Sequence, residues 1–224
     1  KNFTKTRVKF VSNLNLISDN AVNEDSKALS FNYHNQFSDS RLYGNDIEDN
    51  TTRIIYGLEN QTKILNKKLR LNLNQSYDFK KETNYTKQIN QKSNLSDLAF
   101  EAKTNFSNLN FKMDTRLDNI HLDKKEMNYS LDYSDMFDIS LNYNETDRRA
   151  FKDISSDTKS LGVYFGKKIN DNFKFSYESA LNLKDDYSPL TQKINLSLFD
   201  ECSRLDITYT DERFNDNYNT KPNE

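Results

Sequence analysis

The sequence predicts an all-β protein: part of a transmembrane up-and-down antiparallel β-barrel, with about 11–12 strands of a larger barrel. Three observations predict this fold. Apolar and polar residues alternate one for one along successive segments of about ten residues, the length of a membrane-crossing strand. The connections between these segments alternate between short and long. The chain is also polar on average and yet rich in aromatic residues.

The alternation is clear where leucine recurs at every second position. Leu69, Leu71 and Leu73 are separated by Arg70 and Asn72. Successive side chains of a strand point to opposite faces, so the pattern predicts one apolar and one polar face. No stretch shows a comparable helical period of 3.6 residues.

The same alternation places the other strands. We expect about ten strands from residue 52 onward, one over 6–16 and a weaker one over 28–34. In hydrocarbon a barrel pairs all of its backbone groups internally. The apolar face is therefore expected to meet lipid, and the polar face to line a wet lumen.

The connections have the rhythm of a membrane barrel. Residues 80–94, 118–125 and 146–157 are long connections, whereas Ser107–Asn108 and Ser134–Met136 are tight turns. Membrane barrels have short periplasmic turns and longer extracellular loops. The alternatives are a soluble β-sandwich, whose strands are usually nearer ~5–6 residues, and a repetitive surface adhesin, for which a repeated motif is expected.

Composition supports the barrel and excludes other classes. Only 34% of the residues are hydrophobic, and the mean hydropathy is −0.96, too low for a thick two-layer core. Disordered chains are poor in aromatics, but this one has 13 Tyr and 15 Phe. A net charge of −2 indicates no nucleic-acid partner, and no apolar run approaches the ~20 residues of a membrane helix.

Charged residues fall on the predicted lumen face of the strands. Arginine and lysine there would attract phosphorylated sugars, and arginine can bind phosphate with two hydrogen bonds. Acidic residues such as Glu101 and Asp114 share that face, so a self-neutralising hydrated lumen is the alternative. The basic lumen-facing candidates are Arg70, Lys103, Lys112, Arg116 and Lys174.

Nothing in the sequence predicts an enzyme. A nucleophile needs a base within hydrogen-bond reach, and neither His34 nor His121 falls on a predicted strand face beside a serine. No carboxylate pair stands out for acid–base chemistry. The solitary Cys202 excludes an internal disulfide, and two histidines leave little for a soft metal site. No cofactor is therefore expected.

Several short segments, taken in order, resemble the barrel signature of the LptD family, whose members assemble lipopolysaccharide in the outer membrane. The first part of the signature contains Asn23, Glu24, Asp25, Ser26, then Asn35-Gln36-Phe37-Ser38, Arg41, Gly44, Asp46, Glu48, Arg53, Tyr56 and Gly57. Downstream, Gln75-Ser76-Tyr77, Leu95-Ser96-Asp97 and Asp200-Glu201-Cys202 follow, the last resembling alphaproteobacterial members. The chain departs from the signature at Val22, Ile47 and Asn74, where the family has proline, arginine and glycine.

The resemblance implies a function and a set of partners. It implies transport of lipopolysaccharide into the outer leaflet of the outer membrane of a Gram-negative cell, with an LptE-like plug lipoprotein in the lumen and a periplasmic LptA-type bridge. Residues 1–224 would be the C-terminal part of the barrel, without the N-terminal periplasmic domain, the early strands and the final strand. A porin-like passive channel is the nearest alternative.

The resemblance also implies roles for individual residues. It implies that Cys202 pairs with a cysteine in the absent N-terminal domain, since the periplasm supports disulfides. The signature residues Asn23 to Ser26 and Arg41 to Arg53 would form a loop region that organises the barrel mouth or the lumen near the exit of the lipid. For Arg41, Asp46, Glu48 and Arg53 in that loop, an internal ion-pair network and contact with lipid both remain open, as does an ordinary solvated loop.

Overall fold

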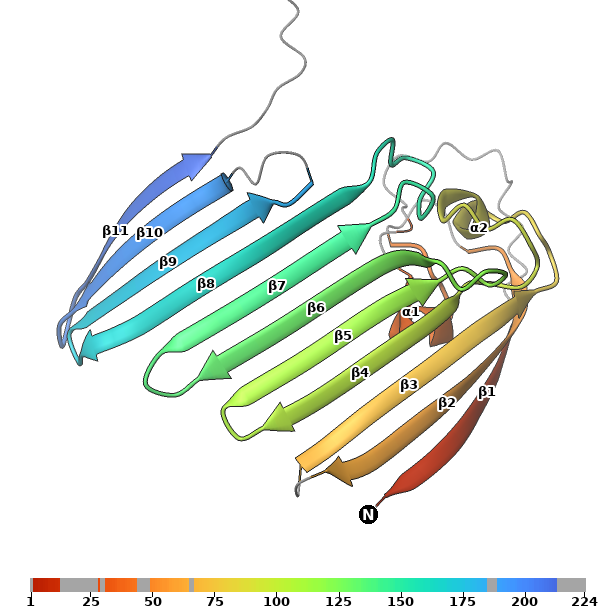
Figure 1. Cartoon of the computed structure of the whole chain (residues 1–224), viewed down its shortest axis with the longest axis horizontal. Coiled ribbons are helices and arrows are strands. Elements are labelled where there is room, and N and C mark those ends of the chain that lie inside the picture. Colours follow the sequence, from red (N-terminus) through yellow and green to blue (C-terminus); the bar gives the residue numbers. More distant parts are fainter. Residues whose placement is uncertain are drawn as a thin grey trace, which may run out of the picture.

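The computed structural model describes residues 2–12, 28, 31–43, 49–64, 67–184 and 189–212. These residues form one antiparallel sheet of 11 strands, in which neighbours in the chain are neighbours in the sheet (Figure 1). The strands are β1 (Phe3–Ser12), β2 (Thr52–Ile64), β3 (Lys67–Asp78), β4 (Leu98–Phe106), β5 (Leu109–Leu117), β6 (Lys124–Ser134), β7 (Asp138–Thr146), β8 (Thr158–Asn170), β9 (Phe173–Asn182), β10 (Pro189–Phe199) and β11 (Arg204–Glu212). The prediction of an all-β, up-and-down fold is confirmed.

The two faces of the sheet follow from the alternation. The outer face carries the apolar set, and the polar face carries the residues between them. On β3 the outer face comprises Leu69, Leu71, Leu73, Gln75 and Tyr77, and the polar face Arg70, Asn72, Asn74, Ser76 and Asp78. The register keeps like with like across neighbouring strands, because Met113 on β5 lies opposite Tyr129 on β6, and Tyr129 opposite Tyr143 on β7.

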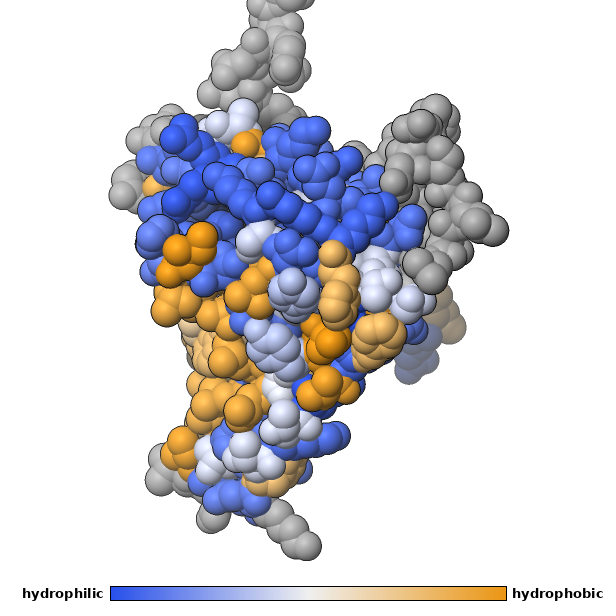
Figure 2. Space-filling model, turned by 90° about the vertical axis from the view of Figure 1, so that its right-hand side faces the viewer, coloured by the Kyte–Doolittle hydropathy of each residue, from blue (hydrophilic) through white to orange (hydrophobic). Residues whose placement is uncertain are grey.

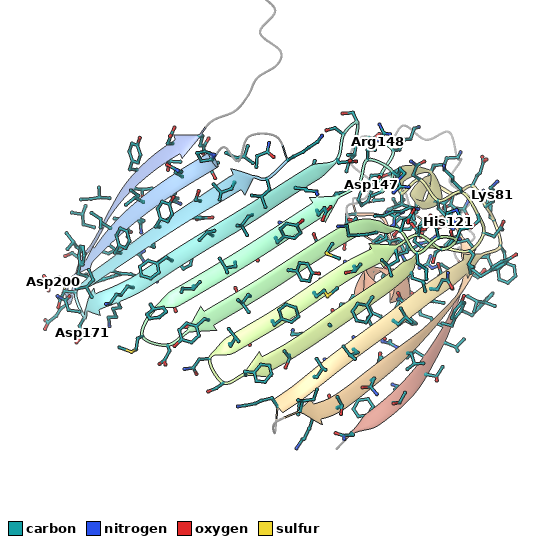
Figure 3. All side chains as sticks on the ribbon, in the orientation of Figure 1. Lys81, His121, Asp147, Arg148, Asp171 and Asp200 are labelled. Carbon is teal, nitrogen blue, oxygen red and sulfur yellow. The ribbon has the colours of Figure 1, made fainter. Side chains whose placement is uncertain are left out.

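The two ends of the sheet differ as the sequence predicts. Turns such as Ser107–Asn108 lie at one edge of the sheet, the short-turn end, where Figure 3 labels Asp171 and Asp200. The longer connections gather at the opposite, long-connection end, where Figure 3 labels His121 and Asp147. The hairpins therefore run up and down between one rim of short turns and one rim of longer connections.

The N-terminal part of the chain differs from the expectation. The strand expected over 28–34 is absent from the described residues there, and a short helix, α1 (Tyr33–Phe37), begins within that range. The Asn32 side chain accepts a hydrogen bond from the Asn35 backbone amide at 2.9 Å and caps the helix. The Asn32 cap thus favours a helix at Tyr33–Phe37, where the weak alternation of residues 28–34 predicted a strand. The strand expected over 6–16 begins earlier, at Phe3, and its residues 13–16 lie outside the described part.

A second short helix was also not anticipated from the sequence. Helix α2 (Asn84–Gln88) lies in the connection between β3 and β4, and a reciprocal capping box between Thr83 and Thr86 starts it. Both helices are too short to show a hydrophobic period. Within the described residues, neither helix has the length and apolar character needed to cross a membrane.

The sheet is open. Within the described residues β1 pairs only with β2, and β11 pairs only with β10. An unpaired strand edge exposes backbone N–H and C=O groups that hydrocarbon cannot satisfy. The sheet is therefore a partial barrel wall.

Adjacent residues on β7 test the assignment of the two faces. Leu141 lies on the outer face, and its neighbour Asn142 lies on the polar face. In lipid vesicles Leu141→Arg should lower the free energy of unfolding by about 2–4 kcal/mol, because it places a cation in hydrocarbon. Asn142→Arg should change it by less than about 0.5 kcal/mol, because the side chain stays in water. Urea unfolding followed by circular dichroism measures both; equal effects would contradict the assignment.

Candidate functional site

The outer face is an exposed apolar surface. Val8 and Phe10 on β1 and Tyr209 on β11 each leave more than half of their surface accessible, and apolar residues between them are also exposed. Seen from the side of β1, apolar side chains gather below a hydrophilic cap at the long-connection end (Figure 2). A soluble protein rarely exposes an apolar patch of this extent. The surface is suited to contact with lipid.

The polar face is covered at one side of the sheet by helix α1. The Asn74 side-chain amide donates to the Tyr33 carbonyl at 3.0 Å, and the Ser76 hydroxyl donates to Gln36 Oε1 at 3.2 Å. His34 Nε2 lies 3.1 Å from Glu101 Oε2. Polar side chains are buried under the helix because each has a partner in it. Helix α1 is therefore seated on the lumen side of β3 and β4.

Gly57 on β2 allows helix α1 to pack closely against the sheet. A Cβ atom built at Gly57 would lie 3.0 Å from Cζ of Phe37 and 3.0 Å from the Leu73 carbonyl oxygen. No larger residue fits between the ring and the neighbouring strand without displacing one of them. The glycine of the signature thus has a packing role. Its neighbour Tyr56 lies on the outer face and donates its hydroxyl to Gln75 Oε1 at 2.6 Å.

A buried ion network fastens the segment after α1 to the sheet. Arg41 Nε donates to Asp49 Oδ2 at 2.7 Å, and Arg41 Nη2 donates to Asp78 Oδ1 at 2.7 Å. Arg53 Nη1 donates to the same Asp49 oxygen at 2.9 Å. All four side chains are fully buried, and their formal charges balance. We name this set, Arg41, Asp49, Arg53 and Asp78, the first ion network.

Further contacts complete the first ion network. Thr51 Oγ1 donates to Asp78 Oδ1 at 3.0 Å, and the Arg41 guanidinium lies 4.2 Å from the centre of the Tyr85 ring. Burial opposes a charge on Arg41, but the carboxylates of Asp49 and Asp78 raise its pKa above the ordinary value. Burial also raises the pKa of Tyr85. Arg41 therefore remains a cation, and it is held by Asp49 before β2, by Asp78 at the end of β3 and by Tyr85 in α2.

A second ion network lies on the neighbouring strands at the same end. Arg116 on β5 donates through Nε to Asp97 Oδ2 at 2.7 Å, and Lys125 on β6 lies 2.9 Å from that same oxygen. Two loop carbonyls also accept from Arg116, those of Ile89 at 2.6 Å and Ala150 at 2.7 Å. One buried guanidinium thus joins the connections that follow β3 and β7 to the polar face.

Asp118 extends the second ion network toward solvent. Its carboxylate lies 3.1 Å from the Lys125 ammonium. Burial acts to raise the pKa of Asp118, but backbone amides of Ile120 and His121 and the Lys125 ammonium together lower it to about 2. Asp118 therefore remains a carboxylate across the physiological pH range.

The structure separates the sequence-predicted residues into groups. Arg41 and Arg53 belong to the first ion network, and Arg116 belongs to the second. Arg70, Lys103, Lys112 and Lys174 lie on the polar face; the first three are exposed and Lys174 is partly buried. The signature residues Asn23, Glu24, Asp25, Ser26, Gly44, Asp46 and Glu48 lie outside the described residues.

Sequence reasoning missed the acidic members of both networks. Asp49 and Asp78 flank β2 and β3, and only Asp97 stood in a segment used for the family resemblance. Asp78 continues the polar positions of β3 to its last residue, which is the one signal that could have found it. The pairing itself depends on loops that return to the sheet.

The other candidate residues are isolated. Cys202 lies exposed in the short turn between β10 and β11. Among the described residues, no three His, Cys, Asp or Glu side chains are grouped to hold a metal ion.

The apolar outer face, the polar inner face and the seated helix define a class: the wall of a transmembrane β-barrel with a wet, partly filled interior. A family model described as LptD, LPS transport system D, matches residues 12–173, more than half of the chain. The chain belongs to the LptD family. This is a family of outer-membrane proteins that act in lipopolysaccharide transport, and it is not an enzyme family. No curated protein matches the chain.

Two isosteric substitutions test the importance of the first ion network. Asp49→Asn leaves two buried guanidinium groups with one carboxylate, so it should lower the free energy of unfolding by about 3–5 kcal/mol. The matched control is Asp206→Asn, because Asp206 forms an exposed pair with Arg204 at 2.7 Å. This control should change stability by less than about 1 kcal/mol. Urea unfolding in lipid vesicles measures both, and similar values for the two variants would contradict a structural role.

Proposed function

We propose that the chain forms part of the barrel wall of an LptD/LptE-type translocon, which transports lipopolysaccharide and inserts it into the outer leaflet of the outer membrane. The match of residues 12–173 to the LptD family carries this proposal. The two-faced sheet supports it physically. Sugars can follow the hydrated polar face, while acyl chains stay in the hydrocarbon that the outer face contacts.

The transported molecule leaves through a seam in the wall. An amphipathic lipid cannot cross a sealed barrel without drawing its acyl chains through water. A seam between weakly paired strands provides a lateral exit, and the strands that form it lie outside the described sheet. The energy for transport is supplied upstream, so this wall needs no cofactor.

The partners occupy different parts of the barrel. We place an LptE-like plug lipoprotein against the polar face of β8–β10, where Glu178 and Lys193 are exposed, in contrast to the part covered by α1. A periplasmic LptA-type bridge delivers lipopolysaccharide through a domain outside this sheet. Outer-membrane lipid surrounds the outer face.

Cys202 anchors the wall to the periplasmic domain. Its short turn belongs to the end of a membrane barrel that faces the periplasm, where disulfides persist. The exposed thiol is open to a partner outside the described sheet. We propose a disulfide from Cys202 to that domain, holding the bridge in line with the lumen.

Depletion of the natural full-length protein tests the transport proposal. Newly made lipopolysaccharide should then stay inside the cell envelope, and its fraction accessible at the cell surface should fall after pulse labelling. Re-expression of the protein should restore it. An unchanged surface fraction combined with reduced uptake of small solutes would favour the porin-like channel and contradict the proposal.

Gel mobility tests the proposed disulfide. The full-length protein should migrate differently with and without reductant, and Cys202→Ser should remove this difference. Loss of a native disulfide should also lower stability by about 2–5 kcal/mol. Ser203→Ala, in the same turn, is the control and should keep the mobility difference. A wild-type protein insensitive to reductant would rule out the disulfide.

A further inference from the structure

Three basic residues face one another across three adjacent strands of the polar face. Arg70 on β3 lies opposite Lys103 on β4, and Lys103 lies opposite Lys112 on β5. Strands in a sheet are about 4.8 Å apart, so the backbones that carry the three cations follow one another at that spacing. Like charges placed directly opposite in a sheet destabilise it. We call Arg70, Lys103 and Lys112 the basic row.

Two members of the basic row have no counter-charge among the described residues. Arg70 and Lys103 form no ion pair or hydrogen bond there through their side chains, whereas Lys112 pairs with Asp114 at 2.5 Å. Glu101 lies two residues from Lys103 on the polar face of β4, and its carboxylate is already engaged. Asn72 donates to it at 2.7 Å, and His34 contacts it at 3.1 Å.

Two further lysines increase the positive charge of the region around the basic row. Lys63 and Lys68 lie opposite each other on the same face of β2 and β3, one pair closer to the turn. A hollow of about 450 Å³ opens beside the row. It is lined by Lys67, Lys68, Arg70, Lys103 and Asn105. None of the described residues that line this hollow is a carboxylate.

The contrast with Arg116 shows that the row is not a structural ion network. Arg116 lies on the same face, at the long-connection end of β5, and is fully buried among carboxylates and carbonyls. Arg70 and Lys103 are exposed to the lumen at the opposite end of the strands. Arg70 and Lys103 therefore repel each other at a part of the polar face that no described loop covers.

We infer that the basic row, with Lys63 and Lys68, is a phosphate-binding subsite for the headgroup of lipopolysaccharide at the short-turn mouth of the lumen. This inference rests on the proposed function and adds to it a place where the headgroup is held. The Arg70 guanidinium can bind a phosphate with two hydrogen bonds, and the lysines add point charges. At the periplasmic end, the subsite meets the headgroup on entry.

Photocrosslinking in cells tests the subsite. A photoreactive residue in place of Asn105, which lines the hollow, should form an adduct with lipopolysaccharide in the natural full-length protein. Arg70→Gln with Lys103→Gln should lower the adduct about tenfold or more, because charge-assisted hydrogen bonds are lost. The control is Lys168→Gln with Lys174→Gln, an opposed basic pair on the same face of β8 and β9, and it should leave the adduct unchanged.

The chemistry of the ligand is tested on the purified full-length protein. Intact lipopolysaccharide should bind more tightly than its dephosphorylated form, and higher salt should weaken this binding. The glutamine variants should lose the preference for phosphate. Inorganic phosphate should compete only weakly, because it lacks the rest of the headgroup.

Each contrary outcome identifies what fails. An adduct unaffected by the glutamine pair, an equal loss in the control pair, or equal binding of the dephosphorylated lipid overturns the subsite and leaves the transport proposal intact. Binding of inorganic phosphate without lipopolysaccharide also overturns it. Absence of any lipid adduct, both at Asn105 and at Asn128 elsewhere on the polar face, would instead contradict the proposed function.

Discussion

Backbone hydrogen bonding is the constraint on which the rest of this structure depends. Hydrocarbon offers no partner for a peptide N–H or C=O, so a chain that crosses it as strands must pair each strand with its neighbours. The 11 strands do this in chain order, through hairpins, with few register shifts. Once the backbone is paired in this way, each side chain needs only to suit the side that it faces, which is hydrocarbon at the outer face and water at the polar face. A polar average composition is then compatible with a stable membrane wall, because only one residue in two meets lipid.

The polar face raises a different question, namely how loops are held over a surface of polar side chains. The two ion networks provide one solution. Each buries arginine against carboxylates from a different part of the chain, and Arg116 also binds two loop carbonyls. Because the buried charges have lost their water, removing one partner costs much free energy, although the intact pair adds little net stability. They specify where the connections lie, and so they shape the long-connection end of the lumen.

Some cations on the polar face are paired with carboxylates and others are not. This difference connects the structure to transport. At the long-connection end each buried arginine among the described residues pairs with a carboxylate. At the short-turn end Arg70 and Lys103 remain without a counter-charge within the described residues and face an open hollow. Unneutralised cations on β3 and β4 at the short-turn end suit an anionic headgroup that enters the lumen from that end.

The sequence by itself determined the strands, their order, the two faces and the alternation of turns and loops, because a period of two and a tight hairpin are local properties of the chain. It also placed Arg70, Lys103 and Arg116 on one face. Only the tertiary structure decided that Arg116 is buried in an ion network while Arg70 is not, and that residues 33–37 form a helix on the lumen side. Those outcomes depend on Asp49, Asp97 and the carbonyls of distant loops, whose positions are set by how the loops return to the sheet and not by any local pattern.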